Sequence, residues 1–293
     1  MVNQTGNRSQ LRIAVAGATG RVGRALVARL AKDPVQVVAL SRNASSIATS
    51  ASVQAAEADF DKPSTLLEAM QGADRLFLAH GTSDRQVANE IALIDAAVTA
   101  GVSHIVKLSA MGPPTRLHPF DWHMQIEANL AGREIGYTVL RPSSFVDTLN
   151  RAKAPVAEAT WGGAAGDGLV NLIDSRDVAE VARVALLDEL FLSSQRAYHL
   201  TGPACVTMPQ VAEELSKLLD RPVTYQHRTR AEQRALLIAS GSSEMVTDLL
   251  LGLDRIFREG VLAETTTTVS DLLGRPARSV VQWLTDNLNG FMK

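Results

Sequence analysis

The chain has 293 residues, of which 46% are hydrophobic and 20% charged, a composition typical of soluble globular proteins. Its formal net charge of −2 gives no sign of a nucleic-acid partner or an anionic membrane surface, and its single cysteine, Cys205, excludes an intramolecular disulfide. The first ten residues, MVNQTGNRSQ, lack the apolar core of a signal peptide, and no run of about 18 apolar residues follows. We therefore expect a cytoplasmic protein.

The first half of the chain alternates apolar strands with helices. LRIAVAGATGRVGRALVARLAK reads as a strand, a glycine turn and a helix. A second helix is predicted over 85–101, with Val87, Ile91, Ile94 and Val98 as its apolar face. Further strands are predicted over 35–40, 53–60, 74–80, 104–109 and 137–142. This alternation predicts an α/β fold with a Rossmann-type, doubly wound parallel sheet.

The pattern changes after about residue 150, where a glycine-rich loop, WGGAAGDG, is followed mainly by helices. Two of these helices begin with a capping box, formed by Thr207 with Gln210 and by Ser279 with Gln282. We expect an NADP-binding Rossmann domain over 9–150, with a return segment near 169–200. A smaller, mainly helical subdomain that caps the substrate is expected over 151–168 and 201–293.

GATGRVG, residues 17–23, follows a predicted strand and opens a predicted helix. Its three glycines permit a tight turn, close approach of the backbone to a pyrophosphate, and close packing of the helix on the sheet. The helix N-terminus then offers N–H groups and partial positive charge to the phosphates. The alternative is a purely structural glycine turn. The residues assigned to this phosphate site are Gly17, Thr19, Gly20, Arg21, Val22 and Gly23.

The end of the second strand, ALSRNAS, indicates which dinucleotide is bound. NAD-binding sites usually place an acid here to bond the ribose hydroxyls, whereas this chain has Ser41 and Arg42. A guanidinium can bind a 2′-phosphate through two hydrogen bonds, and Arg21 could supply a second positive charge. Both arginines could instead be solvated surface residues. The missing acid favours NADPH/NADP as cofactor.

The chain resembles the NmrA-like family of atypical short-chain dehydrogenases/reductases, which includes quinone-reductase-like members. The resemblance rests on GATGRVG, SRN, EADFDKPSTLLEAMQGAD, VSHIVKLSAMG, GYTVLRPSSF, GAAGDG and LTGPACVTMPQVAEELSKLLDRPVTY. It implies that Asp59 and Phe60 lie by the adenine, that Ala79, His80 and Gly81 line the ribose and nicotinamide, and that Ser109 faces the nicotinamide. It also implies that Ser143, Ser144 and Phe145 border the substrate cleft, beside the loop that begins at Trp161.

Structural interpretations of several of these residues stay open. Asp59 could cap the following helix, and His80 could be a hydrogen-bonded residue at a strand end. Asp177 is interpreted as a structural acid at a helix start, and Cys205 as inert because no His or Lys flanks it. The histidines lack the spacing of metal ligands, so no metal site is expected.

A carbonyl reductase needs a proton donor, and the Tyr–Lys pair of short-chain dehydrogenases, four residues apart, is absent from this chain. His123 and Glu127 have helical i, i+4 spacing, so Glu127 could orient His123 as the donor. His123 could equally well only shape the pocket. Ser109 is a further candidate donor to the carbonyl, and Lys107 a cofactor or structural contact.

Two classes of function remain. The first is an NADPH-dependent reductase acting on a small-molecule quinone or a hydroxylated aromatic, polycyclic ketone, in which the substrate's own hydroxyl could assist. The second is an NADP(H)-sensing, NmrA-like regulatory protein without turnover. The missing proton donor favours the sensor, and the expected roofed cleft favours the enzyme. We expect a monomer or a homodimer.

Overall fold

The computed structural model describes residues 10–112, 120–192 and 194–292. Most of the polar N-terminal stretch on which the expected location rested therefore lies outside the described residues. The chain divides into two compact units. The first comprises Met1–Ser109, Gln125–Val139 and Ala182–Ala197, and the second Ala110–Met124, Leu140–Val181 and Tyr198–Lys293. In this division residues 169–181, which we expected to return to the Rossmann domain, belong to the second unit.

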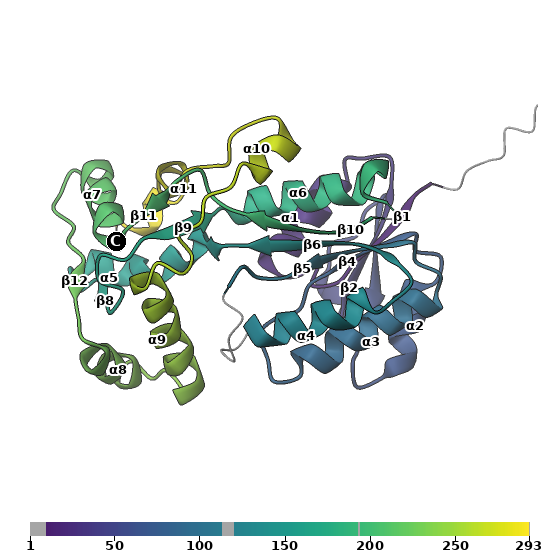
Figure 1. The fold of residues 1–293 in the computed structure, drawn as a ribbon, viewed down its shortest axis with the longest axis horizontal. Helices are drawn as coiled ribbons and strands as arrows, with labels where there is room; N and C mark the ends of the chain where they lie inside the picture. The colour runs from purple at the N-terminus through teal and green to yellow at the C-terminus, as the bar shows by residue number, and fades with distance from the viewer. Residues whose placement is uncertain (1–9, 113–119, 193, 293) are drawn as a thin grey trace, which may run out of the picture. The chain divides into compact units, whose positions relative to one another are not determined.

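A seven-stranded sheet forms the centre of the Rossmann-type fold (Figure 1). Its strand order is β10-β6-β5-β4-β1-β2-β3, and the pairs that join β3, β2, β1, β4 and β5 are parallel. Six of the seven strands were predicted from their apolar runs, and the predicted fold class is confirmed. The strands are β1 (Arg12–Val15), β2 (Gln36–Ser41), β3 (Val53–Glu57), β4 (Arg75–Leu78), β5 (His104–Leu108), β6 (Gly136–Pro142) and β10 (Gln195–Leu200).

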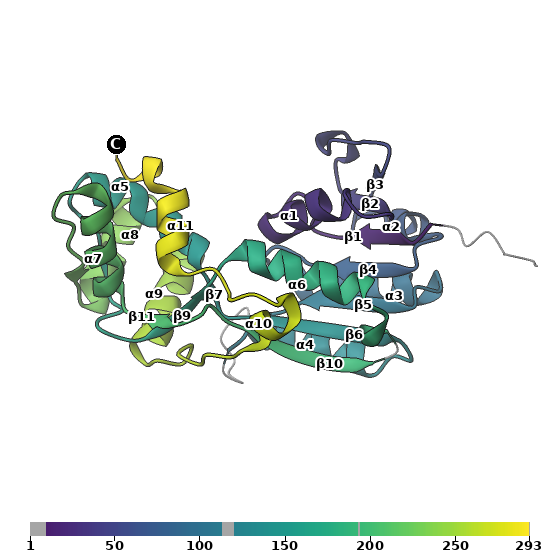
Figure 2. The same cartoon turned by 90° about the horizontal axis from the view of Figure 1, so that it is seen from above.

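Alternation along the strands buries side chains on both faces of this sheet. Ala14 of β1 contributes to a core together with helices α2 (Pro63–Met70) and α3 (Gln86–Thr99). Ile13 and Val15 alternate with Ala14, so they point to the opposite face of the sheet, where they are fully buried. Helix α1 (Arg21–Leu30) lies across the sheet from α2 and α3 (Figure 2). A strand that is covered on both faces must be apolar at nearly every position, which is why the sequence revealed these strands.

The predicted apolar face of helix α3 is buried in part. Ile94 is fully buried and Val87 packs against the core, whereas Val98 is 40% exposed. Glu90, which was not assigned to that face, is fully buried and forms an ion pair with Lys107 of β5, 2.8 Å away and also fully buried. Apolar periodicity therefore found part of the buried face of α3 and missed the part that a charged pair occupies.

The second unit is built mainly from helices around its own apolar core. Both predicted capping boxes are confirmed: Thr207 and Gln210 begin α7, and Ser279 and Gln282 begin α11. Its small sheets contain β7 (Ser144–Phe145), β8 (Gly162–Gly163), β9 (Val170–Ile173), β11 (Cys205–Val206) and β12 (Gln226–His227). The remaining helices are α4 (Phe120–Ala131), α5 (Lys153–Ala157), α6 (Ser175–Leu187), α7 (Met208–Leu219), α8 (Arg230–Ala239), α9 (Glu244–Arg258), α10 (Thr268–Leu273) and α11 (Val280–Asp286), of which α4 and α6 run through both units.

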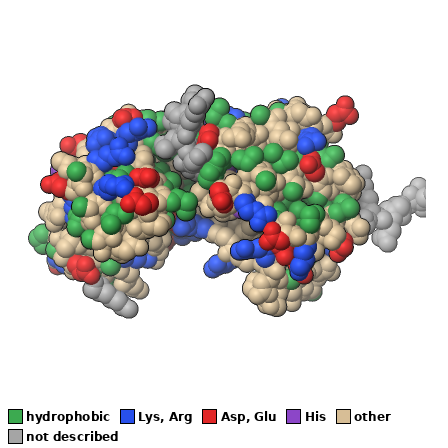
Figure 3. All heavy atoms as spheres, turned by 90° about the horizontal axis from the view of Figure 1, so that it is seen from below, with side chains coloured by type: hydrophobic (Ala, Val, Ile, Leu, Met, Phe, Trp, Pro, Cys, Tyr) green, Lys and Arg blue, Asp and Glu red, His purple; other side chains and the backbone are tan. Residues whose placement is uncertain are grey.

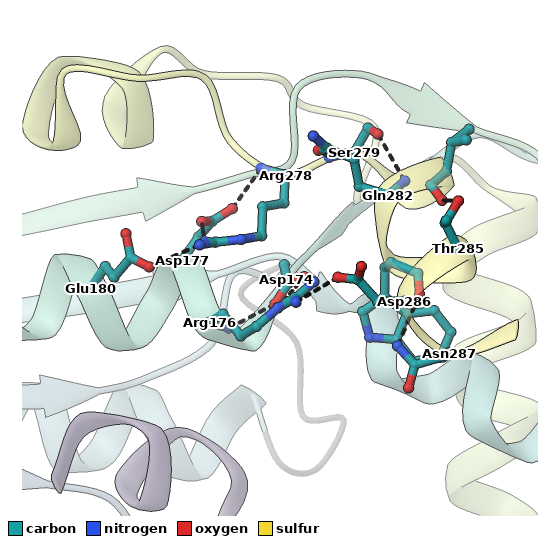
Figure 4. A network of polar contacts seen from close by, with 12 residues as sticks. Asp174, Arg176, Asp177, Glu180, Arg278, Ser279, Gln282, Thr285, Asp286 and Asn287 are labelled. Carbon is teal, nitrogen blue, oxygen red and sulfur yellow. Dashed lines mark hydrogen bonds and ion pairs between the residues drawn. The ribbon is translucent and has the colours of Figure 1, made fainter. Parts of the chain in front are cut away.

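A network of ion pairs ties the C-terminal segment to the start of α6 (Figure 4). The carboxylate of Asp177 is fully buried, accepts a hydrogen bond from the backbone N–H of Arg278 at 2.7 Å, and pairs with the guanidinium groups of Arg275 and Arg278. Arg275 and Arg278 also reach Glu180, one turn further along α6. These contacts agree with the structural role expected for Asp177.

None of the described helices is both long and apolar enough to cross a membrane. On the face drawn in Figure 3, basic and acidic side chains are intermixed and do not gather into one broad patch of a single charge.

Candidate cofactor site

A cavity of about 510 Å³ opens in the first unit where parallel strands end. Strands β1 and β4 are neighbours, yet the chain leaves β1 toward β2 on the other side. Such a reversal of strand order leaves a crevice beyond the carboxyl ends of the strands, where dinucleotides bind in doubly wound sheets. The cavity is lined by residues that follow β1, β2, β3 and β4, so its walls come from four separate connections.

The glycine turn after β1 supplies one wall. Gly17 has φ +70°, and a Cβ atom there would lie 2.8 Å from the carbonyl oxygen of Ala79, so both its conformation and its neighbour require glycine. A Cβ at Gly23 would lie 2.2 Å from the carbonyl oxygen of Gly17. Gly20 is the N-cap of α1, no side chain caps the helix there, and no acid occupies its first turn. The positive end of α1 is therefore available to an anion.

The residues that follow β2 form a second wall of the cavity, and they include those expected to distinguish NADPH from NADH. Ser41 and Arg42 both line the cavity. Among the described residues, no hydrogen bond or ion pair holds the guanidinium of Arg42, and no acid follows β2 at this edge of the cavity. An unpaired guanidinium at this position suits a doubly charged phosphate better than a pair of ribose hydroxyls.

The walls after β3 and β4 meet through aromatic and amide contacts. The rings of Phe60 and His80 pack edge to face with their centroids 5.3 Å apart. Nδ2 of Asn89 donates to Nε2 of His80 at 2.9 Å, so the ring proton lies on Nδ1, which donates to the carbonyl oxygen of Gly81 at 2.5 Å. Both ring nitrogens of His80 are therefore occupied, while its ring still lines the cavity.

Asp59 also lines the cavity, but it does not cap the next helix. The N-cap of α2 is Lys62, whose side chain makes no capping hydrogen bond. The carboxylate of Asp59 instead accepts from the backbone N–H of Asp61 at 3.1 Å, which shapes the loop after β3. The capping interpretation of Asp59 is therefore wrong.

The structure brings most of the expected cofactor residues to one cavity. Those that line it are Gly17, Thr19, Ser41, Arg42, Asp59, Phe60, Ala79, His80 and Gly81. Gly20, Arg21, Val22 and Gly23 do not line it, although they form the start of α1 beside it. Lys107 lies in the buried pair with Glu90, and its Nζ also donates to the carbonyl oxygen of Leu108.

The sequence did not reveal the part of the cavity that follows Gly81. The loop residues Thr82, Ser83, Asp84 and Arg85 line it, as does Asn89 of α3. Arg85 is held by Asp61, 2.8 Å away on the facing loop. These residues carry no periodic pattern, and their position directly after the fourth predicted strand was the signal that could have identified them.

The two candidate proton donors belong to different units. Ser109, only 4% exposed, donates a hydrogen bond from its Oγ to the carboxylate of Glu127. His123 lies on α4, as the i, i+4 spacing with Glu127 required, and is half-buried. Ser109 and Glu127 belong to the first unit and His123 to the second, so the catalytic roles of Ser109 and His123 stay predictions.

The expected substrate residues lie in the second unit. Ser144 and Phe145 form β7, which pairs in parallel with β9, while Ser143 is buried with its Oγ 3.5 Å from Oδ1 of Asn171. Trp161 lines a separate cavity within this unit, to which Ser143, Ser144 and Phe145 do not contribute.

The reversed strand order, the glycine turn and the cavity at the strand ends together define a nicotinamide-dinucleotide-binding protein of Rossmann type. Residues 17–189 match the model of the NAD(P)H-binding family, and the chain belongs to that family. This family assignment confirms the predicted class of cofactor and agrees with the resemblance to atypical short-chain dehydrogenases.

The similarity to two relatives of known name covers nearly the whole chain. An NAD(P)H azoreductase of Xenophilus azovorans is 30% identical over 276 residues, which cover 92% of this chain and 96% of the relative. A (4-alkanoyl-5-oxo-2,5-dihydrofuran-3-yl)methyl phosphate reductase of Streptomyces griseus is 32% identical over 288 residues, 95% of this chain and 99% of the relative. These relatives confirm the predicted oxidoreductase class.

Among solved structures, an NADPH-dependent quinone oxidoreductase of Escherichia coli, crystallised with NADPH, superposes with a TM-score of 0.87. It is 29% identical, and the match covers 94% of this chain and all of that one.

Proposed function

We propose that this chain is an NADPH-dependent reductase that transfers hydride to a carbonyl of a quinone or a hydroxylated aromatic, polycyclic ketone. The observation that carries the proposal is the cavity at the strand ends, where Arg42 has no carboxylate partner among the described residues. Similarity to an azoreductase and a quinone oxidoreductase supports a conjugated acceptor.

The residues of this cavity fit a dinucleotide. Backbone atoms can approach the pyrophosphate closely at Gly17, and the uncapped start of α1 supplies positive charge. Arg42 would hold the 2′-phosphate, while Asp59 and Phe60 would border the adenine. When bound, the cofactor supplies a hydride; the protein's part is to orient it and to keep water from the carbonyl.

Reduction of a carbonyl also takes up one proton, and the chain has no Tyr–Lys pair to deliver it. The hydroxyl of Ser109 already donates to Glu127, so its proton is engaged in that hydrogen bond. In a substrate with a hydroxyl beside its carbonyl, an internal hydrogen bond polarises the C=O and takes up the developing charge. The protein then needs mainly to hold the two reactants in line. This substrate assistance belongs to the proposal.

The test is to follow NADPH oxidation with 1,4-naphthoquinone, with 1-hydroxyanthraquinone and with its parent anthraquinone. We expect turnover of the naphthoquinone, and faster turnover of the hydroxylated anthraquinone than of its parent. Equal rates for that pair would remove substrate assistance from the proposal. No oxidation with any acceptor would reject the reductase.

The absence of the Tyr–Lys pair is also the observation that favours the second candidate, an NADP(H)-sensing protein without turnover. Isothermal titration separates the two functions. Tight NADPH binding without oxidation of NADPH by any quinone or aryl ketone would favour the sensor.

A further inference from the structure

The second unit contains a cavity of about 540 Å³ of its own. Its floor includes Leu149, Trp161 and Phe257, which are each at most 8% exposed and belong to the core of this unit. Helices α8 and α9 form the opposite wall and are tied together by Arg234 of α8 and Asp248 of α9, 2.9 Å apart. All the residues that line this open cavity belong to the second unit.

Helix α8 has more apolar surface than its packing uses. Its sequence, RAEQRALLIA, is apolar over most of its second half, yet no residue of the helix is buried. Leu236 is 49% exposed although it faces the cavity. An exposed leucine that lines a concave, aromatic-floored space indicates a ligand surface, because an apolar ligand would remove it from water.

The cavity is also lined by charged side chains: Arg151 and Glu158, which are exposed, and Arg228 and Asp254, which are not. The guanidinium of Arg228 donates to Oε1 of Gln233 and Oε1 of Gln226, both at 3.1 Å, and to the carbonyl oxygen of Thr160 at 2.5 Å. All three acceptors are neutral, and among the described residues no carboxylate forms an ion pair with Arg228. The charge of Arg228 is therefore available to an electron-rich oxygen of a ligand.

Asp254 is the acid of the cavity that is not exposed. Oδ2 of Asp254 accepts the backbone N–H of Ala164 at 3.0 Å, and burial raises the pKa of its carboxyl. Asp254 and Arg228 both act electrostatically on the phenol of Tyr225, whose ring packs edge to face on Trp161 at 5.2 Å. The cavity thus combines an aromatic floor, a cation for an oxyanion or carbonyl, and an acceptor for a hydroxyl.

We propose that this cavity binds a planar aromatic molecule that carries a carbonyl or phenolate oxygen toward Arg228 and a hydroxyl toward Asp254. The site lies within the second unit and binds its ligand without NADPH. The choice of a hydroxylated aromatic carbonyl rests on the proposed function; the presence of a ligand site does not.

Isothermal titration of the cofactor-free full chain with 2-hydroxy-1,4-naphthoquinone tests the site. The decisive variant is Leu236→Trp, which fills the cavity from α8. Ile238→Trp is the matched control, because Ile238 is 41% exposed on the same helix and does not line the cavity. We expect Leu236→Trp to weaken binding at least tenfold and Ile238→Trp to leave it unchanged. Equal affinity in the two variants would overturn the proposal.

A second comparison does not depend on how well Leu236→Trp folds. The wild-type chain should bind the hydroxylated probe roughly tenfold more tightly than 1,4-naphthoquinone, because the acidic 2-hydroxyl of this probe ionises and gives Arg228 an oxyanion in place of a neutral carbonyl oxygen. Arg228→Gln should remove that difference. Equal binding of both probes to the wild type, or no binding of either, would overturn the proposal.

The remaining outcomes distinguish this site from the proposed function. Binding of the probe without any NADPH oxidation would reject the reductase and leave the site standing. Reduction of the probe by a chain whose affinity for the probe is the same in Leu236→Trp and wild type would reject the site and leave the reductase standing. A dimer that only Leu236→Trp dissociates, in a chain that binds neither probe, would show that a second copy covers the cavity, and would also reject the site.

Discussion

Ser109 and Glu127 are joined by a hydrogen bond in which the Ser109 hydroxyl donates to the carboxylate. The strand end that should face the nicotinamide therefore offers lone pairs of Ser109 and no free hydroxyl proton. A side chain in this state can orient a reactant, but it is a poor acid toward a carbonyl oxygen.

Ser109→Ala should therefore lower the turnover number of NADPH oxidation only modestly, roughly tenfold or less, which corresponds to about 1.4 kcal/mol of activation free energy. His123→Ala should have an effect of the same size. If His123→Ala instead loses several orders of magnitude while its fold and NADPH affinity are intact, then His123 is the general acid.

Arg42→Ala should weaken NADPH binding by roughly ten- to hundredfold, because a hydrogen bond to a charged group contributes about 1.5–3 kcal/mol. Affinity for NADH, which lacks the 2′-phosphate, should change little and serves as the control. Fluorescence titration with both nucleotides measures the effect. Unchanged NADPH affinity in the variant would exclude Arg42 from the cofactor site.

Substitutions at two glycines of the turn should have different effects, one on NADPH binding and the other on the stability of the fold. Gly20→Val should lose NADPH binding and keep the fold, since the nearest atom to a Cβ there is 3.1 Å away and the side chain would project at the start of α1. Gly23→Ala should destabilise the chain by on the order of 3 kcal/mol, because its Cβ would overlap the carbonyl oxygen of Gly17. Circular dichroism and NADPH fluorescence distinguish the two outcomes, and a folded Gly20→Val that still binds NADPH would make the motif a structural turn only.

His104 should make stability depend on pH. Its imidazole is fully buried beside Thr138, and burial, followed by the charge of Arg75, lowers its pKa from 6.5 to about 4. Between these values the unfolded chain binds the proton and the folded chain does not. The contribution of His104, roughly 3 kcal/mol, is therefore present above pH 6.5 and lost as the pH falls toward 4.

Urea unfolding of wild type and His104→Gln at pH 7, 6, 5 and 4 checks this expectation. The difference in the free energy of unfolding between the two proteins should shrink as the pH falls, because glutamine does not titrate. Parallel profiles for wild type and variant would mean that His104 does not titrate in this range.

Asp177→Asn should cost about 3–5 kcal/mol of stability, because it leaves two guanidinium groups facing a neutral amide in the network of Figure 4. Asp286→Asn is the control. Asp286 pairs with Arg176 at 2.6 Å, but its side chain is 51% exposed, so the loss should be at most about 1 kcal/mol. Urea denaturation compares the two variants, and equal losses would contradict the structural role of Asp177.

The strands with the plainest sequence signal are those covered on both faces, whereas β3 was predicted although only Val53 is buried in it. β1, with Ile13 and Val15 toward one layer and Ala14 toward the other, can hardly be anything but apolar. Strand β10, QRAYHL, was not predicted, because only Leu200 is buried in it and its sequence therefore shows no apolar run. Capping boxes were found because each depends on two residues three positions apart, a purely local relationship.

The candidate site was predictable where geometry follows from a single segment, as at Gly17 and Arg42. It was not predictable where side chains pair across the fold. Lys107 was expected near the cofactor, and its buried partner Glu90 comes from a helix whose apolar periodicity gave no sign of a buried charge. The hydrogen bond between Ser109 and Glu127 could not be predicted either, since the two residues are 18 positions apart in sequence.

The place of β10 at the edge of the large sheet bears on how the chain is made. β10 pairs beside β6, although residues 143–194 are synthesised between them, of which 143–181 belong to the second unit. While the ribosome is still adding those residues, β6 is an edge strand with unpaired N–H and C=O groups. The edge of the nascent sheet at β6 therefore stays unpaired until residue 200 has left the ribosome. We expect this interval to be when the chain is most prone to pair wrongly with a neighbouring copy, and when a chaperone would help most.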